Sequence, residues 1–210
     1  MDKTPTDILE EEHRFIQQVV GALPTLIGVL QIRRPVEADL LPEIVEFMQM
    51  FADKCHHGKE EAHLFPVLVQ KGVPVTGCPI GALTHEHQQG RAFVSGLAEA
   101  AQAYARGDDV AIASLVENLR GITELYPNHI WKEDYLLFPM TNKVLGADDQ
   151  KSLMENFVQA DATLGHDTQR RFEEMALELE SLVSQASTDS RLAPRRSSST
   201  VSSSLTSRPW

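Results

Sequence analysis

Two stretches of the chain carry a histidine four residues before a glutamate, a spacing that suits a metal ion. His56 precedes Glu60, and His129 precedes Glu133. Residues four apart lie on one face of a helix, about one turn apart, so each pair presents an imidazole and a carboxylate to the same partner. Aligned without gaps, the two stretches share the histidine, a lysine, the glutamate, a second acid and a Leu-Phe-Pro motif. This internal repeat predicts two halves of one metal site.

The repeat also decides between two registers in the first stretch. His57 stands four residues before Glu61 and therefore has the same spacing as the chosen pair. Counting back nine residues from the phenylalanine of Leu-Phe-Pro reaches His56 in one stretch and His129 in the other, whereas His57 aligns with an isoleucine. We therefore choose His56, and we expect His57, Glu61 and His63 to be solvated or to support the ligands from outside.

The elements that must position these residues are helices, because apolar residues recur at three- and four-residue spacing and no alternating strand pattern occurs. We expect four long helices and a fifth helical stretch, over residues 7–32, 39–70, 79–106, 110–145 and 148–185. Asp7 is the expected N-cap of the first helix. Pro24 and Pro66 should bend the first two helices, and Gly165 is a weak point in the fifth stretch.

The helical pattern predicts an all-α fold. Short connections between the long helices make neighbours antiparallel and predict an up-down-up-down four-helix bundle over residues 1–146. Residues 147–186 should form a helical extension that packs on the outside of this bundle. Residues 187–210 are rich in serine and arginine and have too little apolar surface to offset the entropy of ordering. We predict that they form a disordered tail.

The bundle brings a second pair of histidines level with the repeat. The first and third expected helices each carry a Glu-His dipeptide, Glu12-His13 and Glu86-His87, and in an antiparallel bundle the starts of these helices lie level with the ends of the other two. At ~1.5 Å rise per residue, all candidate ligands fall in one zone roughly 15 Å deep. The six candidate ligands are His13, His56, Glu60, His87, His129 and Glu133.

Four imidazoles and two carboxylates in a bundle core are costly as free polar groups, so a pair of cations would explain them. Two iron ions fit best, with two histidines each and both glutamates bridging. An oxo or hydroxo bridge would then leave one coordination position open on each ion. Mixed imidazole and carboxylate ligation suits iron or manganese, whereas zinc more often takes a four-coordinate site with thiolates.

On these residues the sequence resembles the hemerythrin-like (HHE) proteins. The resemblance rests on the two Glu-His dipeptides and the two His/Glu stretches with their Leu-Phe-Pro motifs, and it extends from about Thr6 to Leu145. It implies a four-helix bundle that holds a non-haem di-iron centre. The oxygen-carrying members have two histidines four apart on the third helix, but here Leu83 and Arg91 flank His87 at that spacing. The symmetric centre of the iron-responsive members is therefore closer.

The family resemblance leaves three functions open. The first is a binding protein that holds dioxygen or a related small ligand, such as nitric oxide or peroxide, at the open iron position. The second is an enzyme that decomposes peroxide or oxidises nitric oxide at the same centre. The third is a sensor of iron, oxygen or redox state, in which loss of the metal changes a contact with a protein partner.

Composition narrows the partners and the compartment. The net charge is −11, with 30 acidic and 19 basic residues, so we expect neither nucleic acid nor an anionic membrane as a partner. No apolar run approaches the ~18 residues of a membrane span, and the N-terminus carries no export pattern, so we expect a cytoplasmic protein. Cys55 and Cys78 should be reduced thiols.

Two other side chains near the motifs have open roles. Tyr126 lies three residues before His129 and either packs in the core or donates a hydrogen bond to a bound ligand. His85 points about 200° around the helix from His87, so we expect it not to bind the metal.

Overall fold

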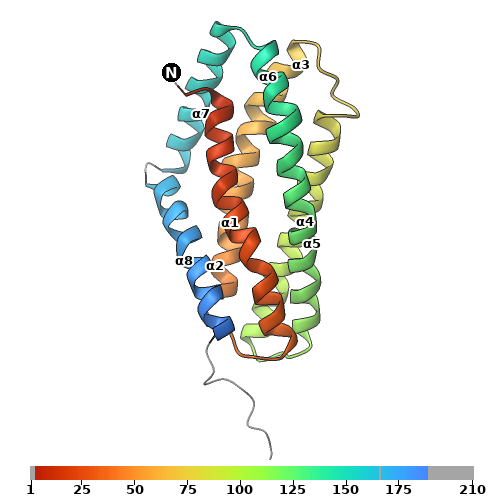
Figure 1. Ribbon diagram of the computed structural model, residues 1–210, viewed down its shortest axis with the longest axis vertical. Helices are drawn as coiled ribbons and strands as arrows, with labels where there is room; N and C mark the ends of the chain where they lie inside the picture. The colour runs from red at the N-terminus through yellow and green to blue at the C-terminus, as the bar shows by residue number, and fades with distance from the viewer. Residues whose placement is uncertain (1–2, 166, 189–210) are drawn as a thin grey trace, which may run out of the picture.

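The computed structural model describes residues 3–165 and 167–188, and this part of the chain is helical without any strand (Figure 1). The elements are α1 (Pro5–Gln31), α2 (Leu40–Glu46), η1 (Phe47–His57), η2 (Glu60–Leu64), α3 (Phe65–Gln70), α4 (Ile80–Ala105), α5 (Ala111–Lys132), η3 (Glu133–Leu137), α6 (Phe138–Val144), α7 (Ala147–Leu164) and α8 (Thr168–Thr188). The elements labelled η are π-helical. The predicted all-α class is confirmed.

Four rods form the bundle. The first is α1, the second runs from α2 through α3, the third is α4, and the fourth runs from α5 through α6. The second rod packs against α4, α4 against α5, and α5 against α1, and the contact of α1 with η1 of the second rod closes the ring (Figure 1). The predicted four-helix bundle is therefore confirmed.

None of the helices in the described part of the chain combines the length and apolar character that crossing a membrane requires.

The first helix begins earlier than predicted. Its N-cap is Thr4 rather than Asp7, with Pro5 in the first turn, where a missing N–H costs nothing. The Thr4 side chain accepts a hydrogen bond from the Asp7 backbone N–H, and the Asp7 carboxylate accepts one from the Thr4 backbone N–H. Asp7 thus caps the helix from its third position, in a reciprocal capping box.

Each Leu-Phe-Pro motif marks a change of helix type. The π-helical turns η2 and η3 end just before the phenylalanine, and Pro66 and Pro139 lie in the first turn of α3 and α6. A proline has no N–H, and its ring clashes with the carbonyl four residues earlier in a regular α-helix. A π turn contains more residues than an α turn and relieves this clash. At Pro66, where the sequence predicts a bend, the structure changes from π-helix to α-helix.

The C-terminal extension consists of two helices, α7 and α8, which lie along one side of the bundle against α1 and the second rod (Figure 1). They are separated at Gly165, whose φ of 109° favours glycine, so the predicted weak point is a true break. The helix α8 continues to Thr188, two residues beyond the predicted end of the extension. The rest of the predicted tail, residues 189–210, lies outside the described residues.

The apolar core is divided into two clusters. One contains Ile16 and Phe51, and the other contains Leu9 and Leu64. His13 lies between Leu9 and Ile16 along α1, and is therefore placed at the boundary between the clusters. The candidate ligands thus form a polar layer between two apolar ones, which keeps bulk water from both sides.

Close approach of α4 and α5 depends on a glycine. A Cβ atom added at Gly121 would lie 2.5 Å from the ring of Phe93, whereas one added at Gly28, on the exposed side of α1, would meet nothing within 4 Å. We expect Gly121→Ala to lower the free energy of unfolding by about 1–3 kcal/mol. Gly28→Ala should raise it by about 0.5–1 kcal/mol. Chemical denaturation of both variants measures the difference, and equal changes would contradict this account of the α4–α5 contact.

Candidate metal centre

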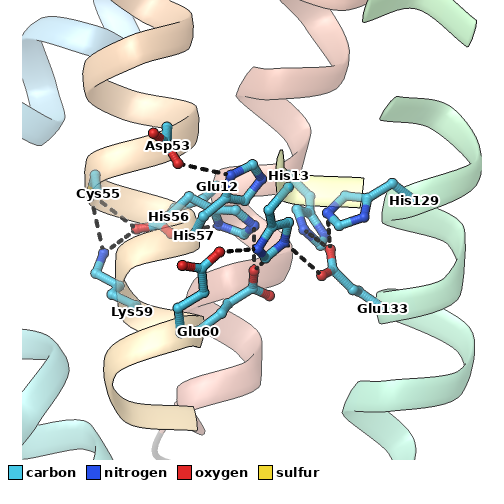
Figure 2. A network of polar contacts seen from close by, with 12 residues as sticks. Glu12, His13, Asp53, Cys55, His56, His57, Lys59, Glu60, His129 and Glu133 are labelled. Carbon is cyan, nitrogen blue, oxygen red and sulfur yellow. Dashed lines mark hydrogen bonds and ion pairs between the residues drawn. The ribbon is translucent and has the colours of Figure 1, made fainter. Parts of the chain in front are cut away.

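The six candidate ligands lie together in the middle of the bundle. Each is buried, with at most 3% of its surface exposed. They come from all four rods: one histidine each from α1 and α4, and a His/Glu pair from each of the other two. Figure 2 shows His13, Glu60 and Glu133 pointing toward one another between the helices. The structure therefore brings together every side chain that the repeat and the dipeptides predict.

The four histidines of this cluster form two pairs. The ring centroids of His13 and His56 are 4.5 Å apart, and those of His87 and His129 are 4.8 Å apart. Glu60 lies between the pairs, with Oε2 3.9 Å from His56 Nε2 and 3.4 Å from His87 Nε2. One carboxylate thus reaches a histidine of each pair.

Glu133 has an equivalent position on the opposite side. Its Oε2 lies 3.2 Å from His13 Nε2 and 3.3 Å from His129 Nε2, and its Oε1 lies 3.8 Å from His87 Nε2. Two carboxylates, each shared by both histidine pairs, are the arrangement in which carboxylates bridge two metal ions.

Four carboxylates outside the cluster orient the imidazoles. Each accepts a hydrogen bond from the Nδ1 of one histidine, which leaves the Nε2 lone pair directed at the centre. The hydrogen bonds join His13 to Asp134 (2.6 Å), His56 to Glu12 (3.0 Å), His87 to Glu61 (2.6 Å) and His129 to Glu86 (3.0 Å). This pattern is common around metal-binding histidines.

The acceptor atoms that face the centre have no hydrogen-bond partners. They are the Nε2 atoms of His13, His56, His87 and His129 and both carboxylate oxygens of Glu60 and Glu133. Buried polar atoms are almost always satisfied, because an unmade hydrogen bond costs free energy. Eight such atoms converging in one layer fit cations well, and nitrogen and oxygen donors without a thiolate fit iron or manganese.

Without a cation, the cluster balances its charge with protons. Burial lowers the pKa of His56 well below its usual value, because the charged imidazole would be desolvated. Burial acts in the same direction on His13, but the hydrogen bond to Asp134 and the charge of Glu133 outweigh it and raise the pKa of His13 to about 10. Similar carboxylate contacts raise the pKa of His87 to about 11. A bound metal ion would displace these protons.

The internal repeat of the sequence also repeats in the contacts. In each half, a lysine three residues after the histidine pairs with the carboxylate that orients that histidine. The two sets are His56, Glu12 and Lys59, and His129, Glu86 and Lys132. The sequence alignment of the two stretches therefore reflects an approximate twofold arrangement around the centre.

His57 breaks this symmetry. It is 3% exposed, so of its two expected roles the structure favours support of a ligand over solvation, and its ring stacks on that of His87 with centroids 3.8 Å apart and planes inclined by 14°. Nitrogens of His57, His87 and His129 lie within 4.8 Å of one another. A metal ion lies near the plane of each imidazole that binds it, and two stacked, nearly parallel rings share no such point. This geometry favours a role for His57 beside His87 over a shared place in one ligand set.

The neighbouring side chains differ in their relation to the centre. Glu61, half-buried, orients His87, whereas His85 is exposed and contacts Gln89. Tyr126 is buried, with its ring 6.3 Å from that of His129, so it packs against the centre. Burial raises the pKa of the Cys55 thiol to about 12, in agreement with an inert thiol.

A cavity of about 270 Å³ lies beside the centre. Its lining includes His57, Asp53, Arg91 and Tyr126. Arg91 pairs with Asp53 at 2.7 Å, and Asp53 lies 3.3 Å from His57 Nδ1. A cavity of this size admits small molecules only.

Residue spacing did not predict the outer contacts of the cluster. Glu12 and Glu86 were expected only as parts of the two Glu-His dipeptides, and the roles of Asp134 and Lys59 were not predicted. The repeat contained a clue, because the lysine and the second acid occur in both halves. Side chains that recur with the ligands are candidates for orienting them.

Comparison with known proteins identifies the family. The family model of the hemerythrin HHE cation binding domain matches residues 4–141, more than half of the chain. The chain belongs to this family. The match to the HHE family covers the four-helix bundle as far as the middle of α6 and includes all six candidate ligands, and it leaves α7 and α8 outside. Cation binding is therefore the property that the family and the cluster both support.

Known relatives of this HHE protein do not add an activity. One protein from Mycobacterium bovis and two from Mycobacterium tuberculosis, each named as uncharacterized, are 26% identical over 155 residues, or 73% of this chain. The chain spans 59% of the length of each of these relatives. No solved structure matches the chain.

Proposed function

We propose that this HHE protein is a non-haem di-iron protein that binds dioxygen or a related small ligand. His13 and His56 would hold one iron, His87 and His129 the other, and the two glutamates would be shared. The observation that carries this proposal is the convergence of eight buried acceptor atoms without hydrogen-bond partners. Two dications match two carboxylates and four neutral imidazoles better than one ion does, because the histidines fall into two pairs.

When bound, the iron pair supplies electrons and open coordination positions for a small ligand such as dioxygen, nitric oxide or peroxide. The protein's own residues hold and shield this chemistry. The four outer carboxylates keep each Nδ1 protonated and each Nε2 aimed inward. The two apolar clusters exclude water from either side of the polar layer, and a cavity lies beside His57, whose ring stacks on that of His87.

An anaerobic titration of the iron(II)-loaded protein with dioxygen tests the proposed function. Optical spectroscopy should give a new charge-transfer band that is lost again when the dioxygen is removed. Rapid, irreversible oxidation to the ferric state would instead favour the enzyme or the sensor. A protein that takes up one zinc ion and no iron would contradict the di-iron assignment itself.

The choice of His56 over His57 gives a direct prediction for single variants. His56→Ala should lose about one of two iron ions per chain, because it removes half of the histidine ligation of one ion. His57→Ala should retain both ions, since His57 stacks on a ligand instead of facing the shared glutamates. Metal analysis of the desalted proteins measures the difference. Equal losses, or a greater loss in His57→Ala, would show that the register is wrong.

A further inference from the structure

Lys59 is a fully buried cation that joins the C-terminal extension to the metal centre. None of its surface is exposed. Its ammonium group pairs with Glu12 of α1 and with Asp161 of α7, whose Oδ1 lies 2.6 Å from Nζ. The Cys55 sulfur lies 3.5 Å from the same Nζ. Figure 2 shows Lys59, Cys55 and Glu12 beside the helix that carries His56.

This group is not a second cation site. Donor atoms of Glu12, Cys55 and Asp161 lie within 4.8 Å of one another, a spacing that suits a metal ion. The Lys59 ammonium group, however, contacts all three and already supplies the positive charge. The cluster is therefore an ion-pair network, and its importance lies in what it connects.

Through Glu12, the ion-pair network reaches the candidate ligand His56. One oxygen of Glu12 pairs with Lys59, and the other accepts the hydrogen bond from His56 Nδ1 at 3.0 Å. Glu12 is itself 1% exposed, so no bulk water replaces a lost partner. A change in how Lys59 is held would therefore move Glu12, and with it the imidazole of His56.

The other half of the centre shows what the extension adds. There Lys132 pairs with Glu86, which orients His129, but Lys132 is 28% exposed and contacts a single carboxylate among the described residues. Water can solvate the Lys132 ammonium group. Lys59 has no such access, and a buried ammonium group is stable only when it is fully compensated. Asp161 provides that compensation from a helix outside the part of the chain that matches the HHE family.

We infer that Asp161 and Lys59 are positioning residues through which the C-terminal extension completes the His56 half of the metal centre. Metal binding at His13 and His56 and docking of α7 on the bundle then stabilise each other, because coupling between two binding events is reciprocal. In the described part of the chain, the second half, at His87 and His129, has no such contact with the extension. The inference rests on the proposed pair of metal ions and adds that the two ions respond differently to the extension.

Titration of the metal-free, full-length protein with iron(II) under anaerobic conditions tests this coupling. The wild type should bind two ions. Asp161→Asn should bind one ion with unchanged affinity and the other about tenfold more weakly. Glu155→Gln, which removes an exposed carboxylate from the same helix, is the matched control and should behave like the wild type. Asp161→Glu keeps the charge and should restore much of the lost affinity.

Hydrogen exchange of the α7 amides separates coupling from a merely structural effect. In the wild type, loading with iron should slow exchange in α7. In Asp161→Asn, exchange in α7 should be the same with and without iron. A structural role alone would change exchange equally in both states and leave iron binding intact.

The outcomes distinguish this inference from the proposed function. Fewer than two ions in the wild type would overturn the proposed function, and the inference with it. Two ions in the wild type, with unchanged affinities in Asp161→Asn, would overturn the inference alone. Equal weakening of both ions in that variant would also overturn it, because the contact of Asp161 reaches one half of the centre only.

Discussion

Iron-loaded protein should unfold at a temperature about 10 °C higher than metal-free protein at neutral pH. The folded protein gathers eight buried acceptor atoms that cations would bind, and the unfolded chain does not hold these atoms together, so the metal stabilises the folded state and not the unfolded chain. A ligand present at about 1,000 times its dissociation constant adds about 4 kcal/mol. For a chain of this size, each kcal/mol shifts the melting temperature by about 2–4 °C. Matched thermal melts measure the shift.

The stabilisation should shrink as the pH falls from about 8 to about 6. In the metal-free protein the nearby carboxylates raise the pKa of His13 and His87, so these imidazoles carry protons that the metal must displace. Lower pH therefore weakens metal binding and removes its contribution to stability. The double variant Glu60→Gln/Glu133→Gln is the control and should show no iron-dependent shift. Superimposable melts of loaded and metal-free wild type at neutral pH would show that the metal is peripheral.

Glu133→Gln should abolish binding of the iron pair. Glu133 contacts His13, His87 and His129, and it supplies one of the two negative charges shared by both halves. Replacing it with a neutral amide removes a ligand from both ions at once. We expect iron content to fall from two ions to fewer than one per chain, measured by metal analysis after desalting.

Glu61→Gln is the matched control for this prediction, because it removes a carboxylate that touches a ligand from outside the cluster. Glu61 accepts the hydrogen bond from His87 Nδ1 and also pairs with Arg91. Loss of such an outer partner typically weakens metal binding about 10–100-fold, so this variant should still fill with iron at high concentration. If both variants lose iron equally, Glu133 acts as an orienting group instead of a shared ligand.

The sequence by itself determined the helices and the side chains that meet at the centre. Both depend on local spacing: the His/Glu pairs four residues apart define a helix face, and the repeat selects His56 over His57. Antiparallel helices with short connections then place the Glu-His dipeptides level with the repeat. Helix ends were less well determined, because the choice between Asp7 and Thr4 as the cap depends on which backbone N–H groups remain free.

Only the tertiary structure decided which side chains surround the ligands. His56 and Glu12 are 44 positions apart, and Lys59 and Asp161 are about 100 apart, so their contacts depend on how each helix is rotated against its neighbours. Periodicity gives the buried face of a helix but not the partner it meets. The same reason explains His57, which the alignment sets beside an isoleucine and the fold buries against His87. Lys59 is the extreme case, since a lysine is expected in water and stays buried here because two helices each bring it a carboxylate.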